Sequence, residues 1–171
     1  MTDFERNKRS IASWAIALVF LVVAITTLSI FLDKADDEIC RWGKRGYLEY
    51  GLVATITTMI CLVVMIMINV FKNLKATVYF STVFLAILLF AAGVVLAVTY
   101  SSYNNDKMNT PKANTSFCDW LQKTDNYVSC TYLIVASVFS FLAAVVLIVE
   151  FCLTRYIAFV CVPCMLYEEE N

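Results

Sequence analysis

A chain of 171 residues in which 61% are hydrophobic, 16% are charged and none is histidine is too apolar for an ordinary soluble domain. The net charge of -1 leaves no basic surface to neutralise phosphates, which excludes nucleic-acid binding as the expected function. Without histidine, the commonest general base and the commonest metal ligand are missing, so histidine-dependent hydrolysis and zinc sites are excluded as well.

Four long apolar runs account for this composition. They predict an all-α fold in one domain, a polytopic membrane protein whose four transmembrane helices form an antiparallel bundle. Each run supplies about 20 or more residues, which at about 1.5 Å per residue crosses a hydrocarbon core about 30 Å thick. The predicted spans are residues 11–32, 51–71, 76–100 and 132–154.

The N-terminal segment, residues 1–10, carries Arg6, Lys8 and Arg9 immediately before the first span. A basic start before an apolar run also occurs in secretory signal peptides. Here 22 uncharged residues exceed a signal-peptide core, and no small-x-small cleavage pattern follows. We therefore expect a retained first span and a cytoplasmic N-terminus, with Trp14 at the membrane interface.

The first two connections are short. Residues 33–50 are expected to form an outer loop, and residues 72–75 form a cytoplasmic hinge that includes Lys72 and Lys75. Total basic charge does not decide the orientation, because seven lysines and arginines lie in the proposed outer loops and six lie inside. The inner ones are concentrated next to span ends, where the positive-inside tendency is strongest, so both termini are expected in the cytoplasm.

Residues 101–131 are polar and are expected to form a longer second outer loop. The loop contains Asn114, the acceptor of an Asn-Thr-Ser glycosylation pattern. Cys118 and Cys130 enclose eleven residues and are candidates for a disulfide in an oxidising compartment. Cys40, in the first outer loop, is a third candidate that could pair with either of them, remain free or bridge to another chain.

The tail, residues 155–171, contains an apolar stretch that is too short to span the membrane again. It either extends the fourth helix or lies at the cytoplasmic interface. Cys152, Cys161 and Cys164 lie close to that surface, where cysteines are candidates for S-palmitoylation. The alternative is that they serve as small apolar residues of a membrane helix.

Two polar residues stand out inside the spans. Glu150 lies toward the cytoplasmic end of the fourth span, and Asn69 lies near the inner end of the second, where it could hydrogen-bond Glu150. Ionisable residues in spans are costly and mark function by default. We interpret Glu150 either as a structural or snorkelling group, or as a functional ionisable site.

Small residues recur four apart in three spans, a spacing that lets helices approach closely. They are Gly93 and Ala97 in the third span, Ala136, Ser140 and Ala144 in the fourth, and Ser13 and Ala17 in the first. Such spacing either packs one bundle or joins two copies of the chain, and internal packing is the interpretation we favour.

In layout, the whole chain resembles the MARVEL-type family of tetraspan membrane proteins. The most similar stretch is the third span, LLFAAGVVLAVTYSSYNN, with the cysteine-containing loop and the fourth span, LIVASVFSFLAAVVLIVEF. The first outer loop, with 18 residues, is too short for a claudin, and the chain lacks the Cys-Cys-Gly motif of tetraspanins. The resemblance implies a role in membrane apposition, vesicle trafficking, membrane microdomains or cell junctions, with no catalytic residues.

The sequence therefore predicts a non-enzymatic protein that organises membrane or protein contacts in the plasma membrane, endomembranes or vesicles. Its expected partners are membrane lipids, other membrane proteins or a second copy of the chain, and no cofactor, metal or catalytic site is expected. The alternative is a channel or transporter component, or an auxiliary subunit, that uses Glu150. Aromatic residues of the outer loops are candidates for contacts or for interfacial anchors, namely Trp42, Tyr103, Trp120 and Tyr127.

Overall fold

The structure, a computed structural model, describes residues 3–42, 45–72, 75–105, 116–119 and 129–166. Side chains are described within residues 9–33, 46–68, 81–105, 116–119 and 129–154. Four long helices make up most of the described chain: α1 (Asp3–Trp42), α2 (Arg45–Lys72), α3 (Lys75–Asn105) and α5 (Thr131–Leu166). As the sequence predicts, each contains a stretch long and apolar enough to cross a membrane.

The helices are longer than the predicted spans. α1 continues to Trp42 and α2 begins at Arg45, so most of the predicted first outer loop is helical. The reason is that Asp3–Trp42 contains neither glycine nor proline, and the first residue that disfavours helix is Gly43. α3 similarly continues to Asn105, inside the predicted second loop.

The tail forms a helical extension. α5 runs on through Pro163 and ends at Leu166, which decides between the two alternatives for this segment. Pro163 has no backbone N–H, so the carbonyl of Phe159, four residues earlier, receives no intrahelical hydrogen bond from it.

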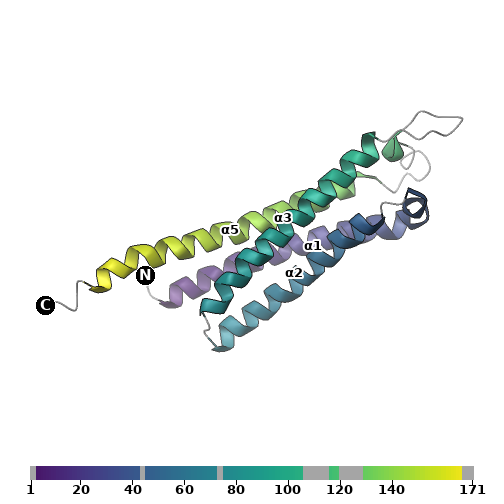
Figure 1. Cartoon of the computed structure of the whole chain (residues 1–171). Helices are drawn as coiled ribbons and strands as arrows, with labels where there is room; N and C mark the ends of the chain where they lie inside the picture. Colours follow the sequence, from purple (N-terminus) through teal and green to yellow (C-terminus); the bar gives the residue numbers. More distant parts are fainter. Residues whose placement is uncertain (1–2, 43–44, 73–74, 106–115, 120–128, 167–171) are drawn as a thin grey trace, which may run out of the picture.

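Each helix packs on two others: α1 packs on α2 and α5, and α3 also packs on α2 and α5. The start of α1 and the end of α5 lie at one end of the molecule (Figure 1). The end of α1 and the start of α2 lie at the other end, near residues 116–119. Four helices thus surround a common interior.

α1 presents a narrow apolar strip to this interior. Its buried residues follow one another at alternating spacings of three and four, the period of helices that cross at a small angle. They are Trp14, Ala17, Leu21, Ala24, Leu28 and Phe31. This strip joins both of the hydrophobic clusters in the bundle, so α1 links its two ends.

The cluster nearer the start of α1, here called the terminal cluster, combines residues from all four helices. Its buried members are Trp14, Ala17, Leu21, Leu62, Met65, Leu85, Ala86, Leu89, Ala143, Ala144 and Leu147. The cluster combines alanines of α3 and α5 with larger side chains from all four helices. This alternation of sizes lets the helices pack without large gaps.

Close helix contacts depend on two glycines. A Cβ atom on Gly93 of α3 would lie 3.0 Å from the Phe141 ring of α5, and one on Gly51 would lie 2.9 Å from the side chain of Leu96. Ser137 Oγ also donates a buried hydrogen bond of 3.0 Å to the Gly93 carbonyl, which requires a close approach of α3 and α5.

The predicted packing residues divide between the interior and the surface. Ala136, Ser140 and Ala144 of α5 are buried, as internal packing requires. Ala97 lies on the exposed side of α3 and does not share the face of Gly93. The reason is the rotation of α3 about its own axis, which turns Gly93 and Leu96 toward the interior and Ala97 away from it.

A disulfide joins Cys118 to Cys130, with 5.7 Å between their Cα atoms, at the end of the bundle opposite the start of α1. Beside it, Phe117 packs against Tyr103 with their ring centroids 4.8 Å apart, and both side chains are fully buried. The sequence offers Tyr103 as a candidate for an outer contact or for an interfacial anchor. Because α3 extends to Asn105, Tyr103 instead falls on the buried face of the helix, two turns beyond Leu96.

We predict that Gly93→Leu lowers the free energy of unfolding by about 1–3 kcal/mol through overpacking against Phe141. Gly93→Ala should change it little, because about 1 kcal/mol of helix propensity offsets the tighter contact. Unfolding in mixed micelles, followed by circular dichroism, measures both variants. Ala97→Leu on the exposed side is the matched control, and equal stability of Gly93→Leu and Ala97→Leu would contradict the prediction.

We also predict that Cys118→Ser lowers the free energy of unfolding by about 2–4 kcal/mol, because the unfolded chain loses a loop constraint. A reducing agent should lower the stability of the wild-type protein by a similar amount and leave that of Cys118→Ser unchanged. Cys152→Ser, which replaces an exposed free thiol, is the control. A wild-type protein insensitive to reductant would show that the disulfide contributes nothing.

Candidate functional site

Glu150 of α5 lies inside the bundle, with 5% of its surface exposed, and faces α1. Ser10 Oγ donates a hydrogen bond to Glu150 Oε1, and Ser13 Oγ lies 2.9 Å from Oε2. Thr154 Oγ1 is 3.3 Å from Oε1. We call these four residues the Glu150 cluster. It joins α1 to α5 through polar side chains.

Helical spacing brings the four residues together. Ser10 and Ser13 are three residues apart on α1 and therefore project from the same side of that helix. Glu150 and Thr154 are four residues apart on α5 and share a face for the same reason. Since α1 packs along α5, the two faces meet.

Two of the hydroxyl groups have a second acceptor. Ser13 Oγ lies 3.2 Å from the carbonyl oxygen of Arg9, one turn earlier on α1. Thr154 Oγ1 lies 2.8 Å from the carbonyl oxygen of Glu150. The cluster therefore contains backbone as well as carboxyl acceptors.

No described lysine or arginine forms an ion pair with Glu150. Arg9 is described, and its side chain is exposed. Among the described side chains, hydroxyl dipoles are the groups that compensate this carboxyl group. They compensate less well than a full opposite charge would, and a buried unpaired carboxylate is costly.

The sequence identified Glu150 but not its partners. Asn69, which we considered as a hydrogen-bonding partner, lies in α2 with its side chain outside the described residues. Ser13 was assigned to helix packing, and Ser10 was assigned no role. The signal that points to them is a pair of hydroxyls three residues apart at the start of the first apolar stretch. Ser13 lies four residues from that start, and Glu150 lies four residues from the end of the fourth stretch.

Most other hydroxyl groups in the spans bond to their own helix, as expected for threonines there. Each donates to the carbonyl oxygen four residues earlier, at 2.8–3.0 Å, in the case of Thr27, Thr55, Thr58, Thr99 and Ser140. These residues satisfy their hydrogen bonds locally. Their donor hydrogens are therefore not available to a ligand.

Trp14 is buried in the terminal cluster, with 3% of its surface exposed, so its side chain does not lie on the outer surface of the bundle. It follows Ser13 and belongs to the apolar strip of α1, the helix that packs on α2 and α5. Its indole N–H has no acceptor among the described side chains. A buried donor without a partner costs about 1–3 kcal/mol.

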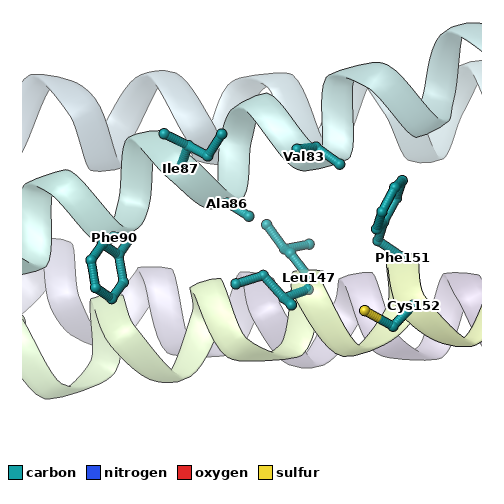
Figure 2. A pocket seen from close by; sticks show the side chains of 8 residues that line it. Val83, Ala86, Ile87, Phe90, Leu147, Phe151 and Cys152 are labelled. Atoms are coloured by element: carbon teal, nitrogen blue, oxygen red, sulfur yellow. The ribbon is translucent and has the colours of Figure 1, made fainter.

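A groove of about 410 Å³ lies between α3 and α5 (Figure 2). Val83, Ile87 and Phe90 line it from α3, and residues of α5 that include Leu147 and Cys152 line it from the other side. Its walls are apolar, apart from the thiol of Cys152. That thiol is free and exposed.

The other candidate residues fall into two groups. The disulfide between Cys118 and Cys130 excludes the pairings we considered between either of them and Cys40. The side chains of Cys40, Asn114, Cys161 and Cys164 lie outside the described residues. Within the described chain, no three histidine, cysteine or acidic side chains are grouped so that they could hold a metal ion.

No known protein family, curated protein or solved structure matches this chain. The site is therefore interpreted from its own contacts.

We predict that Trp14→Phe changes the free energy of unfolding by less than about 1 kcal/mol, because loss of an unpartnered donor offsets the smaller apolar area. Trp14→Ala should cost about 3–5 kcal/mol, because it leaves a cavity in the terminal cluster. Unfolding curves of the three proteins in the same micelles measure both differences. Equal losses of unfolding free energy for the two variants would contradict this, because they would mean that the indole N–H makes a stabilising hydrogen bond.

Proposed function

We propose that the chain is an integral membrane protein whose helices form an antiparallel four-span bundle with both termini in the cytoplasm. Four apolar helices support membrane insertion. The position of the disulfide supports the orientation, because disulfides persist in oxidising compartments and this one lies opposite the start of α1 and the end of α5. Lys72 and Lys75, near the end where α1 starts, agree with the positive-inside tendency.

Within that membrane, the protein serves as a non-enzymatic organiser of lateral contacts with lipids, other membrane proteins or a second copy. The observation that carries this proposal is the separation of polar and apolar side chains. Large apolar residues are exposed along the whole described length of α2 and α3, among them Val53, Ile60, Met67, Phe84, Phe90 and Val98. Hydroxyl groups and Glu150 bond within the bundle, so its outer surface offers mainly dispersion contacts.

The MARVEL-like layout agrees with this role, and it suggests the plasma membrane, endomembranes or vesicles as the location. It also suggests membrane microdomains, trafficking or cell junctions as the setting. Glycosylation of Asn114 and acylation of Cys152, Cys161 and Cys164 are further parts of the proposal. Both modifications would fall on the sides of the membrane that the proposed orientation assigns to them.

The channel or transporter alternative depends on Glu150. Its carboxyl group already contacts Ser10, Ser13 and Thr154, and it is almost completely buried. An engaged, buried carboxyl group favours a structural role between α1 and α5 over a role in an ion pathway.

We predict that a photo-crosslinking amino acid at Val98 of α3 or Ile60 of α2 gives discrete adducts with other membrane proteins or with a second copy in cell membranes. Both side chains are more than half exposed. Leu96 and Leu62, two residues away and fully buried, are the matched controls and should give none. An outward scan of α2 and α3 without any discrete protein adduct would contradict an organising role for these faces.

A flux assay on the purified protein in liposomes separates the two functions. The organising role predicts no ion flux above that of protein-free liposomes. Flux that Glu150→Gln reduces would favour the channel alternative instead.

A further inference from the structure

The groove between α3 and α5 has a buried floor and exposed walls. Ala86 of α3 and Leu147 of α5 line it with buried side chains. Ile87, Phe90 and Ile148 line it with side chains that are 64%, 55% and 46% exposed. The groove is therefore a hollow in the outer surface of the bundle, with a small residue, Ala86, at its base.

The groove runs along the helices. Phe90 follows Val83 by seven residues, which is a rise of about 10 Å along α3. Figure 2 shows Phe90 at one end of the groove and Cys152 at the other. Cys152 lies three residues before Arg155, whereas Phe90 lies nine residues inside the apolar stretch Ser81–Asn105. One end of the groove is thus close to the charged end of the fourth span, and the other is closer to the middle of the third.

The groove is continuous with the outer apolar surface that the proposed membrane insertion exposes to lipid. Val94, one turn beyond Phe90 on α3, and Val145, one turn before Ile148 on α5, are exposed on either side of it. No water can fill a groove in the hydrocarbon core, and an unfilled one loses dispersion contacts along its lining. An extended acyl chain is narrow, apolar and aligned with the spans, so it suits both the lining and the direction of this groove.

Two other occupants suit the lining less well. A second helix packs closely only where small residues lie at the contact, but the exposed walls are formed by Ile87, Phe90 and Ile148. A bilayer lipid held in preference to its neighbours needs a partner for its headgroup. Among the side chains that line the groove, the thiol of Cys152 is the one polar group. An acyl chain joined to that thiol needs neither small residues nor a headgroup site.

We propose that the groove binds a long acyl chain that is attached to Cys152 as a thioester. The thiol is free, exposed and at the end of the groove. Its Sγ attacks the carbonyl carbon of a long-chain acyl thioester, the donor of the chain. The new S–C bond forms as the S–C bond of the donor breaks, and the donor leaves as a thiol with the proton that Cys152 loses. The attached chain then extends from Cys152 toward Phe90, against side chains of both helices.

This inference rests on the proposed membrane insertion and on acylation of Cys152, and it adds the place where the chain lies. An attached chain covers Ile87 and Phe90 of α3. It leaves Val98 of α3 and Ile60 of α2, which do not line the groove, open to the proposed lateral contacts. Acylation would therefore select which part of the outer surface meets other proteins.

A photo-crosslinking amino acid at Ile87 tests the proposal in cells fed with alkyne-tagged palmitic acid. Every cysteine other than Cys118, Cys130 and Cys152 is replaced by alanine. Hydroxylamine cleaves thioesters and releases the tag, unless light has first joined the chain to residue 87. The proposal predicts tag that resists hydroxylamine after illumination and that is lost in Cys152→Ser. Phe84, which is 60% exposed but does not line the groove, is the matched control and should retain several-fold less.

Each other result overturns the proposal. Complete release of the tag, or equal retention at Ile87 and Phe84, would show that no chain lies in the groove. Absence of any hydroxylamine-sensitive tag would show that Cys152 is not acylated. Resistant tag that persists in Cys152→Ser would identify a bilayer lipid as the occupant, and a protein-sized adduct at Ile87 would identify a second helix.

Filling the groove provides an independent readout. Ile148→Trp should lower the retained tag at Ile87 several-fold and leave the hydroxylamine-sensitive tag on Cys152 unchanged. Val149→Trp, at the next residue, is exposed to a similar extent but lies outside the lining, so it should change neither. Equal effects of the two variants would contradict binding in the groove.

Alkaline carbonate extraction of the same membranes separates a failure of this inference from a failure of the proposed function. Protein that stays in the membrane pellet is integral whatever the tag shows, and only the groove is then in question. Protein released by carbonate would contradict the proposed insertion and, with it, the acyl chain in the groove.

Discussion

In the hydrocarbon core of a membrane, water is absent, so every polar group of a spanning segment must find its partner inside the protein. In the proposed membrane setting, the bundle meets this constraint in three ways. Threonines such as Thr55 and Thr58 bond to their own helix. Ser137 reaches across to the backbone of α3 at Gly93. The carboxyl group of Glu150 accepts hydrogen bonds from two hydroxyls of the neighbouring helix α1. Trp14 departs from this pattern, with a buried N–H that has no described acceptor.

The same constraint explains how the helices are held together. Lipid tails are as apolar as leucine, so helices in a membrane associate through close packing and through hydrogen bonds between them. Close packing needs small residues at the contact points, which Gly93 and Gly51 provide. The two ends of the bundle differ in what supplements this packing. At one end the Glu150 cluster joins α1 to α5, and at the other the disulfide between Cys118 and Cys130 lies beside the buried pair of Tyr103 and Phe117.

Much of the fold could be predicted from the sequence, because twenty apolar residues in a row have few alternatives to a membrane helix. The helix ends were predicted less well. Charged residues after Leu32 look like a loop, yet a segment without glycine or proline can continue a helix beyond the hydrocarbon core. Tyr103 was misplaced for the same reason, since a residue assigned to a loop has no helical face.

The candidate site was only partly predictable. Glu150 stands out because a charge in a span is rare, but its partners depend on how α1 and α5 are aligned. That alignment is set by the packing of many apolar side chains between the two helices. No short sequence motif specifies it. The phase of α3 shows the same limit: Gly93 and Ala97 fit one spacing rule, yet only Gly93 faces the interior.

The central claim is that polar groups in the spans are used to join helices, with Glu150 turned toward α1. Short bifunctional thiol reagents test it in native membranes, in a background from which the other free cysteines have been removed. The account predicts rapid cross-linking of Ser13→Cys with Glu150→Cys, and slow cross-linking of Asn69→Cys with Glu150→Cys. Faster cross-linking of Asn69→Cys than of Ser13→Cys would contradict the account. Glu150 would then face α2, and its carboxyl group would not join α5 to α1.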